Sequence, residues 1–211
     1  MKKKFMAVLL AAVMIMTVVL TGCGSDSSSD SGDKETFKVG LVQLVEHTSL
    51  DQIRESIIKQ LEDDGYVDGK NIEIDYQNAQ NEQSNLKTIC QGFVADKVDV
   101  IVAITTPAAQ VAMGETKDIP IIFSAVTDPV AAGIVEDMDN PGGNITGTSD
   151  AVKVDQIMEL ASEITPGYKT VGALYNSSET NSVATVKQLK EYAEENDIKV
   201  VESAITNSNE I

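Results

Sequence analysis

The chain has 211 residues, a formal net charge of −17 at pH 7, one histidine, two cysteines and no tryptophan. An acidic excess of this size argues against nucleic-acid binding, because contacts to phosphates need clustered lysines and arginines. A single histidine and two cysteines argue against a zinc site and against a disulfide framework, so we expect no metal and no cofactor.

The first 22 residues have the layout of a secretory signal peptide. Three lysines at positions 2–4 precede an almost purely apolar stretch, 5–20, which is followed by small residues and Cys23. This layout resembles a bacterial lipoprotein signal, in which the cysteine is lipidated and becomes the mature N-terminus. The alternative is an uncleaved transmembrane anchor, for which the stretch is marginally short. We therefore expect an anchor at Cys23 and a location on the extracytoplasmic face of the cell membrane.

A polar segment separates this leader from the folded part of the chain. Residues 23–36 consist mainly of serine, glycine and aspartate, which cannot bury apolar surface and predict a flexible tether. Removal of the three leader lysines changes the net charge from −17 to −20.

From residue 37 onward, apolar strand-like runs alternate with helical patterns. The expected strands span 37–45, 71–77, 98–104, 120–124, 144–148, 170–175 and 198–202. The expected helices span 50–64, 82–96, 107–116, 153–164 and 181–195. Cys90 lies on the apolar face of the second of these helices and is predicted to be a buried small hydrophobe. The alternation predicts an α/β protein with parallel sheets flanked by helices.

The alternation is interrupted once, between residues 125 and 144. This segment has no long helical pattern and contains Pro129, Pro141, Gly142 and Gly143. We interpret it as an inter-lobe crossing that joins a first α/β lobe, 37–124, to a second, 145–211. The alternative is one continuous sheet with a long irregular insertion. Structureless connections of this length are uncommon within one compact domain, which favours two lobes.

The second lobe is expected to be incomplete. It reaches three strands and two helices before "ITNSNEI", in which Asn207 or Ser208 could cap a further helix. Its sheet would end at an edge that needs cover.

Polar residues follow the expected strands, where open parallel sheets bind their ligands. We predict ligand contacts at the ends of the first, third and fourth strands and at two strand ends of the second lobe. The predicted ligand-binding residues are Gln43, Glu46, His47, Thr48, Ser49, Thr105, Thr106, Ser124, Thr127, Asp128, Asp150, Tyr175 and Asn176.

Two helix starts in this set could bind an anion such as a carboxylate. Thr48 or Ser49 is expected to cap one helix, and Pro107 is suited to the first turn of another. For any single residue, a role only as a cap or turn is the alternative. The joint position of these residues at one end of both lobes favours a binding site.

Few features of the sequence support catalysis. Glu46 and His47 could form an acid/base pair, but no nucleophile in a recognisable setting accompanies them. "GTSDA" at 147–151 has Ala151 where a nucleophile elbow requires its second glycine. The sequence contains no G-x-x-x-x-G-K-[ST] motif, and no G-x-G-x-x-G motif follows a strand. We therefore expect a binding protein and not an enzyme.

The residues from Lys38 onward resemble ABC-transporter substrate-binding lipoproteins of the tryptophan/tyrosine type. The resemblance is carried, in order, by "VGLVQLVEHTSLD", "GYVDGKNIEIDYQNAQN", "IVAITTPAAQ", "IPIIFSAVTDPVAAGIV", "NPGGNITGTSD" and "VGALYNSSETNS". It implies the two-lobed type I periplasmic-binding-protein fold, here with a truncated second lobe. Family members close their lobes on a small ligand.

For function, the resemblance implies capture of an extracytoplasmic small molecule and delivery to an ABC-transporter permease. It suggests an amino acid as the ligand, possibly an aromatic one. Glu46, Asp128 or Asp150 could then pair with the ligand ammonium. The alternatives are a surface sensor or adhesin lipoprotein and a sugar or nucleoside binder of the same fold.

Overall fold

A computed structural model describes residues 36–207 and residue 210. The predicted signal peptide, Cys23 and nearly all of the predicted tether lie outside these residues, so those predictions are not tested by the structure. The elements are β1 (Phe37–Gln43), α2 (Thr48–Asp63), β2 (Ile72–Asn78), α3 (Gln83–Ala95), β3 (Val100–Ile104), α4 (Thr106–Glu115), β4 (Ile121–Val126), β5 (Ile145–Ser149), α5 (Val154–Ile164), β6 (Thr170–Asn176), α6 (Thr180–Glu195) and β7 (Lys199–Ile205). The expected strands and helices are confirmed, with shifts of a few residues at their ends.

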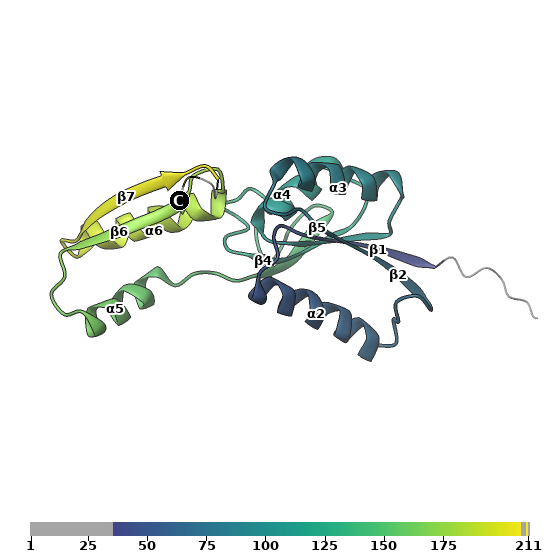
Figure 1. The fold of residues 1–211 in the computed structure, drawn as a ribbon, viewed down its shortest axis with the longest axis horizontal. Helices are drawn as coiled ribbons and strands as arrows, with labels where there is room; N and C mark the ends of the chain where they lie inside the picture. Colours follow the sequence, from purple (N-terminus) through teal and green to yellow (C-terminus); the bar gives the residue numbers. More distant parts are fainter. Residues whose placement is uncertain (1–35, 208–209, 211) are drawn as a thin grey trace, which may run out of the picture. The chain divides into compact units, whose positions relative to one another are not determined.

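The first sheet is parallel throughout, with the strand order β2-β1-β3-β4-β5. Helix α2 covers one face, and α3 and α4 cover the other (Figure 1). Because side chains alternate along a strand, Val39 and Leu41 face α2, whereas Val42 faces α3 and α4. This double cover matches the apolar runs of its strands, as expected for a buried parallel sheet.

The tightest packing in this sheet occurs where β1 meets α3. The Phe93 ring is 1% exposed and lies over Gly40, where an added Cβ would be 2.7 Å from the ring. Cys90, one turn earlier on α3, is fully buried as predicted. Burial raises the pKa of its thiol to about 12, with a smaller contribution from the charge of Glu115.

Strand β5 belongs to the first sheet, which corrects the predicted lobe boundary at residue 145. Ile145 pairs with Ile121 of β4, so the segment 125–144 connects two neighbouring strands of one sheet. Ile134 and Val135 from this segment are buried in the core beside α4. The segment is thus an irregular connection within the first sheet, but a separate second sheet follows, so the alternative of one continuous sheet does not hold either. No helix connects β4 to β5, and the burial of Ile134 and Val135 holds this connection on the sheet instead.

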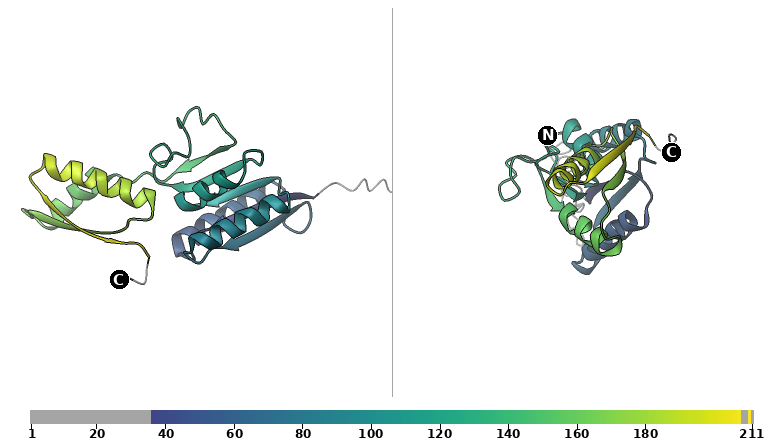
Figure 2. Two further views of the ribbon diagram at one scale, coloured as in Figure 1. Left: turned by 90° about the horizontal axis from the view of Figure 1, so that it is seen from above. Right: turned by 90° about the vertical axis from the view of Figure 1, so that its left-hand side faces the viewer.

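A second sheet contains β6 and β7, which are parallel. Helix α6 packs on both strands, and α5 packs against α6 (Figure 2). The buried apolar residues of this layer are Val154, Met158, Ala173, Val186 and Ala193. The first of the three strands expected in this lobe, 144–148, corresponds to β5 and belongs to the first sheet.

Candidate functional site

The strand order creates a switch point between β1 and β3. The chain leaves β1 toward α2 on one face, and it leaves β3 toward α4 on the opposite face. The connections diverge at the carboxyl ends of these two strands, which is where open α/β sheets form their ligand crevice. The predicted residues after the first and third strands therefore lie at this edge of the sheet.

The backbone at this carboxyl edge is unusual. Gln80 and Asn81 after β2, Thr105 after β3 and Ala125 in β4 are non-glycine residues with positive φ. For β-branched Thr105, with φ of 100°, this is an outlier. Strained backbone of this kind tends to gather at functional sites.

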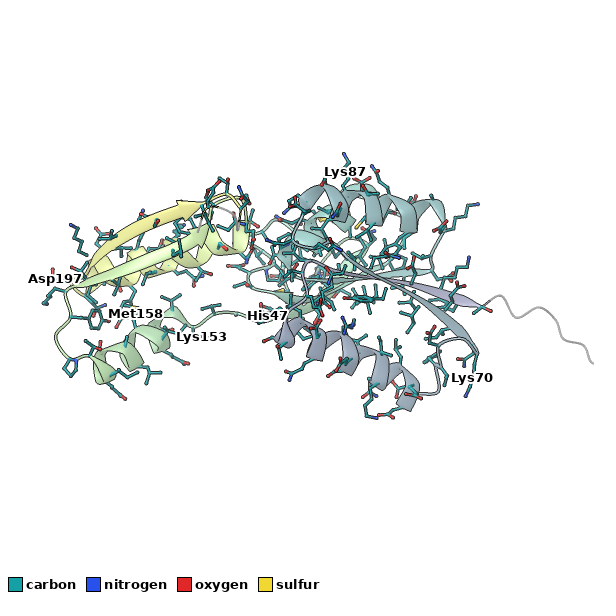
Figure 3. All side chains as sticks on the ribbon, in the orientation of Figure 1. His47, Lys70, Lys87, Lys153, Met158 and Asp197 are labelled. Atoms are coloured by element: carbon teal, nitrogen blue, oxygen red, sulfur yellow. The ribbon has the colours of Figure 1, made fainter. Side chains whose placement is uncertain are left out.

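At the start of α2 the structure corrects the predicted cap. His47, not Thr48 or Ser49, is the N-cap residue, and its Nδ1 accepts a hydrogen bond from the Ser49 N–H at 3.3 Å. The helix begins at Thr48, two residues before its expected start, which places His47 at the capping position (Figure 3). Glu46, Thr48 and Ser49 are exposed beside it.

Gln43, at the end of β1, is fully buried and supports an arginine. Its amide donates to Val45 O at 2.7 Å and to Asp51 Oδ1 at 2.8 Å, and its Oε1 accepts from Arg54 at 3.4 Å. Arg54 also pairs with Asp51 at 3.1 Å. Both ends of the Gln43 amide are thus engaged within the first sheet.

Arg54 in turn lies over Tyr76 of β2. Its guanidinium carbon is 4.5 Å from the ring centroid, and Nη1 donates to the Tyr76 hydroxyl at 2.8 Å. Burial alone would lower the pKa of Arg54, but the Tyr76 hydrogen bond and the Asp51 carboxylate outweigh it and raise the pKa. Arg54 is therefore a fixed cation at the crevice.

The start of α4 carries two threonines whose hydroxyls have no partner. Thr105 is the N-cap residue but makes no side-chain capping bond, and Pro107 stands in the first turn as predicted. Oγ1 of Thr105 and Oγ1 of Thr106 are both buried and unpaired. A buried hydroxyl without a hydrogen-bond partner destabilises a fold by about 1–3 kcal/mol. A hydrogen bond to either threonine hydroxyl would remove this cost.

Of the residues predicted after the fourth strand, Thr127 and Asp128 follow β4, whereas Ser124 lies within it. Asp128 Oδ1 accepts from the Ala131 N–H at 2.9 Å and shapes the connection to β5. Thr127 O accepts from the Ser149 hydroxyl at 3.1 Å, and Ser124 lines a shallow hollow beside α2 together with Ser49. Ser124 and Ser49 are thus brought together.

Two clefts adjoin the carboxyl edge and share Val45 and Gln80. One, of about 760 Å³, is lined by Val45, Glu46, Arg54, Tyr76, Asn78 and Gln80. The other, of about 540 Å³, is lined by Leu44, Val45, Gln80, Asn81, Glu82, Gln83, Ser84, Asn176, Ser178, Glu179, Thr206 and Asn207. Among the predicted residues, Glu46 lines the first cleft and Asn176 lines the second.

Of the three predicted residues Asp150, Tyr175 and Asn176, only Asn176 lines one of the two clefts. The Asn176 Oδ1 accepts from the Ser178 N–H at 3.0 Å, and its amide donates to Glu179, so Asn176 organises its own loop in the cleft. The Tyr175 hydroxyl donates to Glu202 at 3.1 Å, which raises its pKa. Glu202 also pairs with Lys190 of α6. Asp150 is exposed, and its N–H donates to Val126 O.

Arg54, Tyr76 and Asn78 were not among the predicted site residues. "IDYQNAQN" after the second strand already showed polar residues at a strand end, and that signal could have indicated Asn78. Arg54 lies within a helix, two turns from the strand, so only the fold brings it to the crevice.

Within residues 36–207 and 210, no group of histidine, cysteine, aspartate and glutamate side chains is arranged to hold a metal ion. No helix in the same part of the chain is long and apolar enough to cross a bilayer.

A family model described as "ABC transporter substrate binding protein" matches residues 38–211. The chain is 47% identical, over 216 aligned residues, to a tyrosine-binding protein of Clostridioides difficile (strain R20291); the match covers 99% of this chain and 62% of that protein. The chain thus spans about three fifths of this relative's length.

Two solved structures share the architecture. A conserved domain protein from Vibrio cholerae has a TM-score of 0.81 and 43% identity, covering 83% of this chain and 60% of that one. An ABC domain from Streptococcus pneumonia in complex with L-Trp has a TM-score of 0.80 and 43% identity, covering 83% of this chain and 59% of that one.

The parallel sheet flanked by helices is the α/β architecture of type I periplasmic-binding proteins. Together with the family match over most of the chain, it settles the relationship. The chain belongs to the family of ABC transporter substrate-binding proteins.

Proposed function

We propose that this protein binds an aromatic amino acid at the carboxyl edge of the first sheet and delivers it to an ABC-transporter permease. The observation that carries the proposal is the cleft at the carboxyl edge of the first sheet, which Glu46, Arg54 and Tyr76 line together. The names of the C. difficile relative and of the S. pneumonia complex support tyrosine or tryptophan as the ligand class.

The charges at the clefts suit a zwitterion. Arg54 attracts a carboxylate, whereas the acidic Glu46, Glu82 and Glu179 attract an ammonium group. Cleft volumes of about 540 and 760 Å³ lie within the range that small-molecule sites usually have. Tyr76 adds an aromatic wall beside Arg54.

We further propose that a lipid on Cys23 holds the protein at the extracytoplasmic face of the membrane. The apolar leader with its small residues before Cys23 supports this part of the proposal, and the polar segment that follows would space the folded part from the bilayer. Such an anchor keeps a captured ligand close to the permease.

Isothermal calorimetry on the full-length protein tests the ligand class. L-Tyr, L-Trp, L-Leu, a hexose and a nucleoside would be titrated in parallel. We expect heat of binding for at least one of the two aromatic amino acids and none for the hexose or the nucleoside. Binding of the hexose or nucleoside alone would reassign the site to that class, and the absence of binding to all five would remove the proposal.

A further inference from the structure

We propose that Gln110 is a positioning residue that holds one wall of the ligand cleft in place. Gln110 lies on α4, which packs on the first sheet, and its side chain contacts the first residue of α6, which packs on the second sheet. Gln110 itself lines neither cleft. The proposal rests on the proposed function, because it names a residue that controls how long the ligand stays bound.

Both ends of the Gln110 amide are engaged in hydrogen bonds. Its Nε2 donates to Ala132 O at 2.9 Å, in the connection between β4 and β5, and its Oε1 accepts from the Thr180 hydroxyl at 3.2 Å. Ala132 packs against the core of the first sheet. One side chain thus joins α4, this connection and the start of α6, although Thr180 is 70 residues away in the sequence.

The bridge meets α6 directly beside residues that line a cleft. Thr180 follows Glu179, whose carboxylate accepts from the Asn176 amide at 2.8 Å. Glu179 and Asn176 line the cleft of about 540 Å³ together with Val45 and Gln80, which follow the first two strands of the first sheet. A displacement of Thr180 would therefore move this wall of the cleft relative to the first sheet.

The two helices that the bridge joins differ in how firmly they are held. Ala109 and Ala112 of α4 are fully buried in the core of the first sheet, so Gln110 stands on a rigid support. At α6, Thr180 is exposed, and the N-cap residue Glu179 makes no side-chain capping bond. The Gln110 bridge therefore restrains a helix start that its own cap does not secure.

The arrangement that contains the bridge is the one more similar to a ligand complex. The structure has a TM-score of 0.80 with the S. pneumonia complex with L-Trp, and of 0.63 with a ligand-free, open structure of a substrate binding protein from Clostridium difficile. The second protein is nevertheless the more similar in sequence, at 52% identity against 43%. A contact made in one arrangement shifts the population toward that arrangement, so we expect the bridge to favour the ligand-bound form.

The test is Thr180→Val in the full-length protein, because valine keeps the shape of threonine and removes the hydroxyl. The chain has no tryptophan, so stopped-flow fluorescence of L-Trp itself reports its release, and isotope-labelled L-Tyr serves for the other ligand. We expect dissociation to become about three- to tenfold faster, as for the loss of one neutral hydrogen bond. The association rate and the melting temperature of the ligand-free protein should not change, since Thr180 is exposed.

Thr185→Val is the matched control on the same helix. The Thr185 hydroxyl donates to Asn181 O at 2.9 Å within α6, so its removal should leave the dissociation rate unchanged. Thr180→Ser keeps the hydroxyl and should release the ligand at the wild-type rate. Gln110→Met removes the other partner of the bridge and should also speed dissociation. The double variant should be no faster than Gln110→Met alone, because both changes remove the same bond.

Three results would overturn the proposal. The first is a wild-type dissociation rate in both Thr180→Val and Gln110→Met while the wild type binds the amino acid. The second is a rate in Thr180→Ser or Thr185→Val as fast as that in Thr180→Val, because the helix and not the bridge would then set the rate. The third is a wild type that binds neither L-Trp nor L-Tyr, which removes the proposed ligand class itself.

Discussion

The two sheets of this protein differ in how completely their faces are covered. In the first sheet, helices lie on both faces, and Leu41, Ile101 and Ile104 are fully buried. In the second sheet, α6 covers one face, while Leu174 is 60% and Val201 49% exposed. The apolar side chains Ile157, Leu160 and Ile164 of α5 are exposed as well. Apolar sequence alone therefore does not make a core, because each face also needs a partner.

The difference matters for the candidate site. Groups on the first sheet, such as Arg54 with its Gln43 and Asp51 contacts, are positioned by a closely packed layer. Groups on the second sheet, such as Asn176, are positioned mainly by hydrogen bonds within their own loop. We expect the first sheet to carry the larger share of stability and to hold its part of the site independently of ligand.

The largest expected effect is that of Phe93→Ala. Truncation of this buried ring should lower the free energy of unfolding by about 3–5 kcal/mol, because it removes apolar contacts and leaves a cavity over Gly40. Leu174→Ala on the second sheet is the matched control and should change it by less than about 1 kcal/mol, since its side chain is largely exposed. Urea denaturation measures both. Equal losses in the two variants would mean that the sheets are equally well packed.

A second, smaller effect concerns Cys90 at alkaline pH. Its folded-state pKa is raised from 9.0 to about 12, so the unfolded chain loses the thiol proton first as the pH rises. The contribution of the neutral Cys90 thiol to the free energy of unfolding is therefore fully present below pH 9. It falls between pH 9 and 12, by up to about 1.4 kcal/mol per pH unit.

Cys90→Ala should remove this part of the alkaline slope, which urea denaturation at pH 8, 9 and 10 can measure against the wild type. A thiol reagent at pH 8 should label Cys90 only in urea. Rapid labelling of the native protein would contradict the burial of the Cys90 thiol beneath α3.

The smallest expected effect is that of Glu202→Gln on the second sheet. Hydrogen bonds from Lys190 and Tyr175 lower the pKa of Glu202, so its ionised form stabilises the fold at neutral pH. Because the pKa is lowered, this contribution is present above the ordinary value of 4.5 and is lost as the pH falls through the folded-state pKa.

Exposure to solvent screens these contacts, and we expect only a slight drop in melting temperature at pH 7 and a smaller one at pH 3. Thermal melts of the wild type and the variant at both pH values test this. A large drop at pH 7 would show that the second sheet depends on this network.

Local patterns in the sequence were enough to predict the elements and several of their details. The i, i+3, i+4 spacing around Cys90 predicted its burial, because a helix places such residues on one face whatever surrounds it. Pro107 predicted the first turn of α4, since its fixed φ and missing N–H suit that position. The polar residues after each strand likewise predicted which edge of the sheet carries the candidate site.

Three features were decided only by tertiary structure. Strand β5 joined the first sheet because Ile145 pairs with Ile121, and strand pairing is a contact between residues distant in sequence. Arg54 reached the crevice because α2 packs over β2, which no spacing along the chain specifies. Whether a hydroxyl finds a partner depends on every group around it, so the unpaired oxygens of Thr105 and Thr106 appear only once the chain is folded.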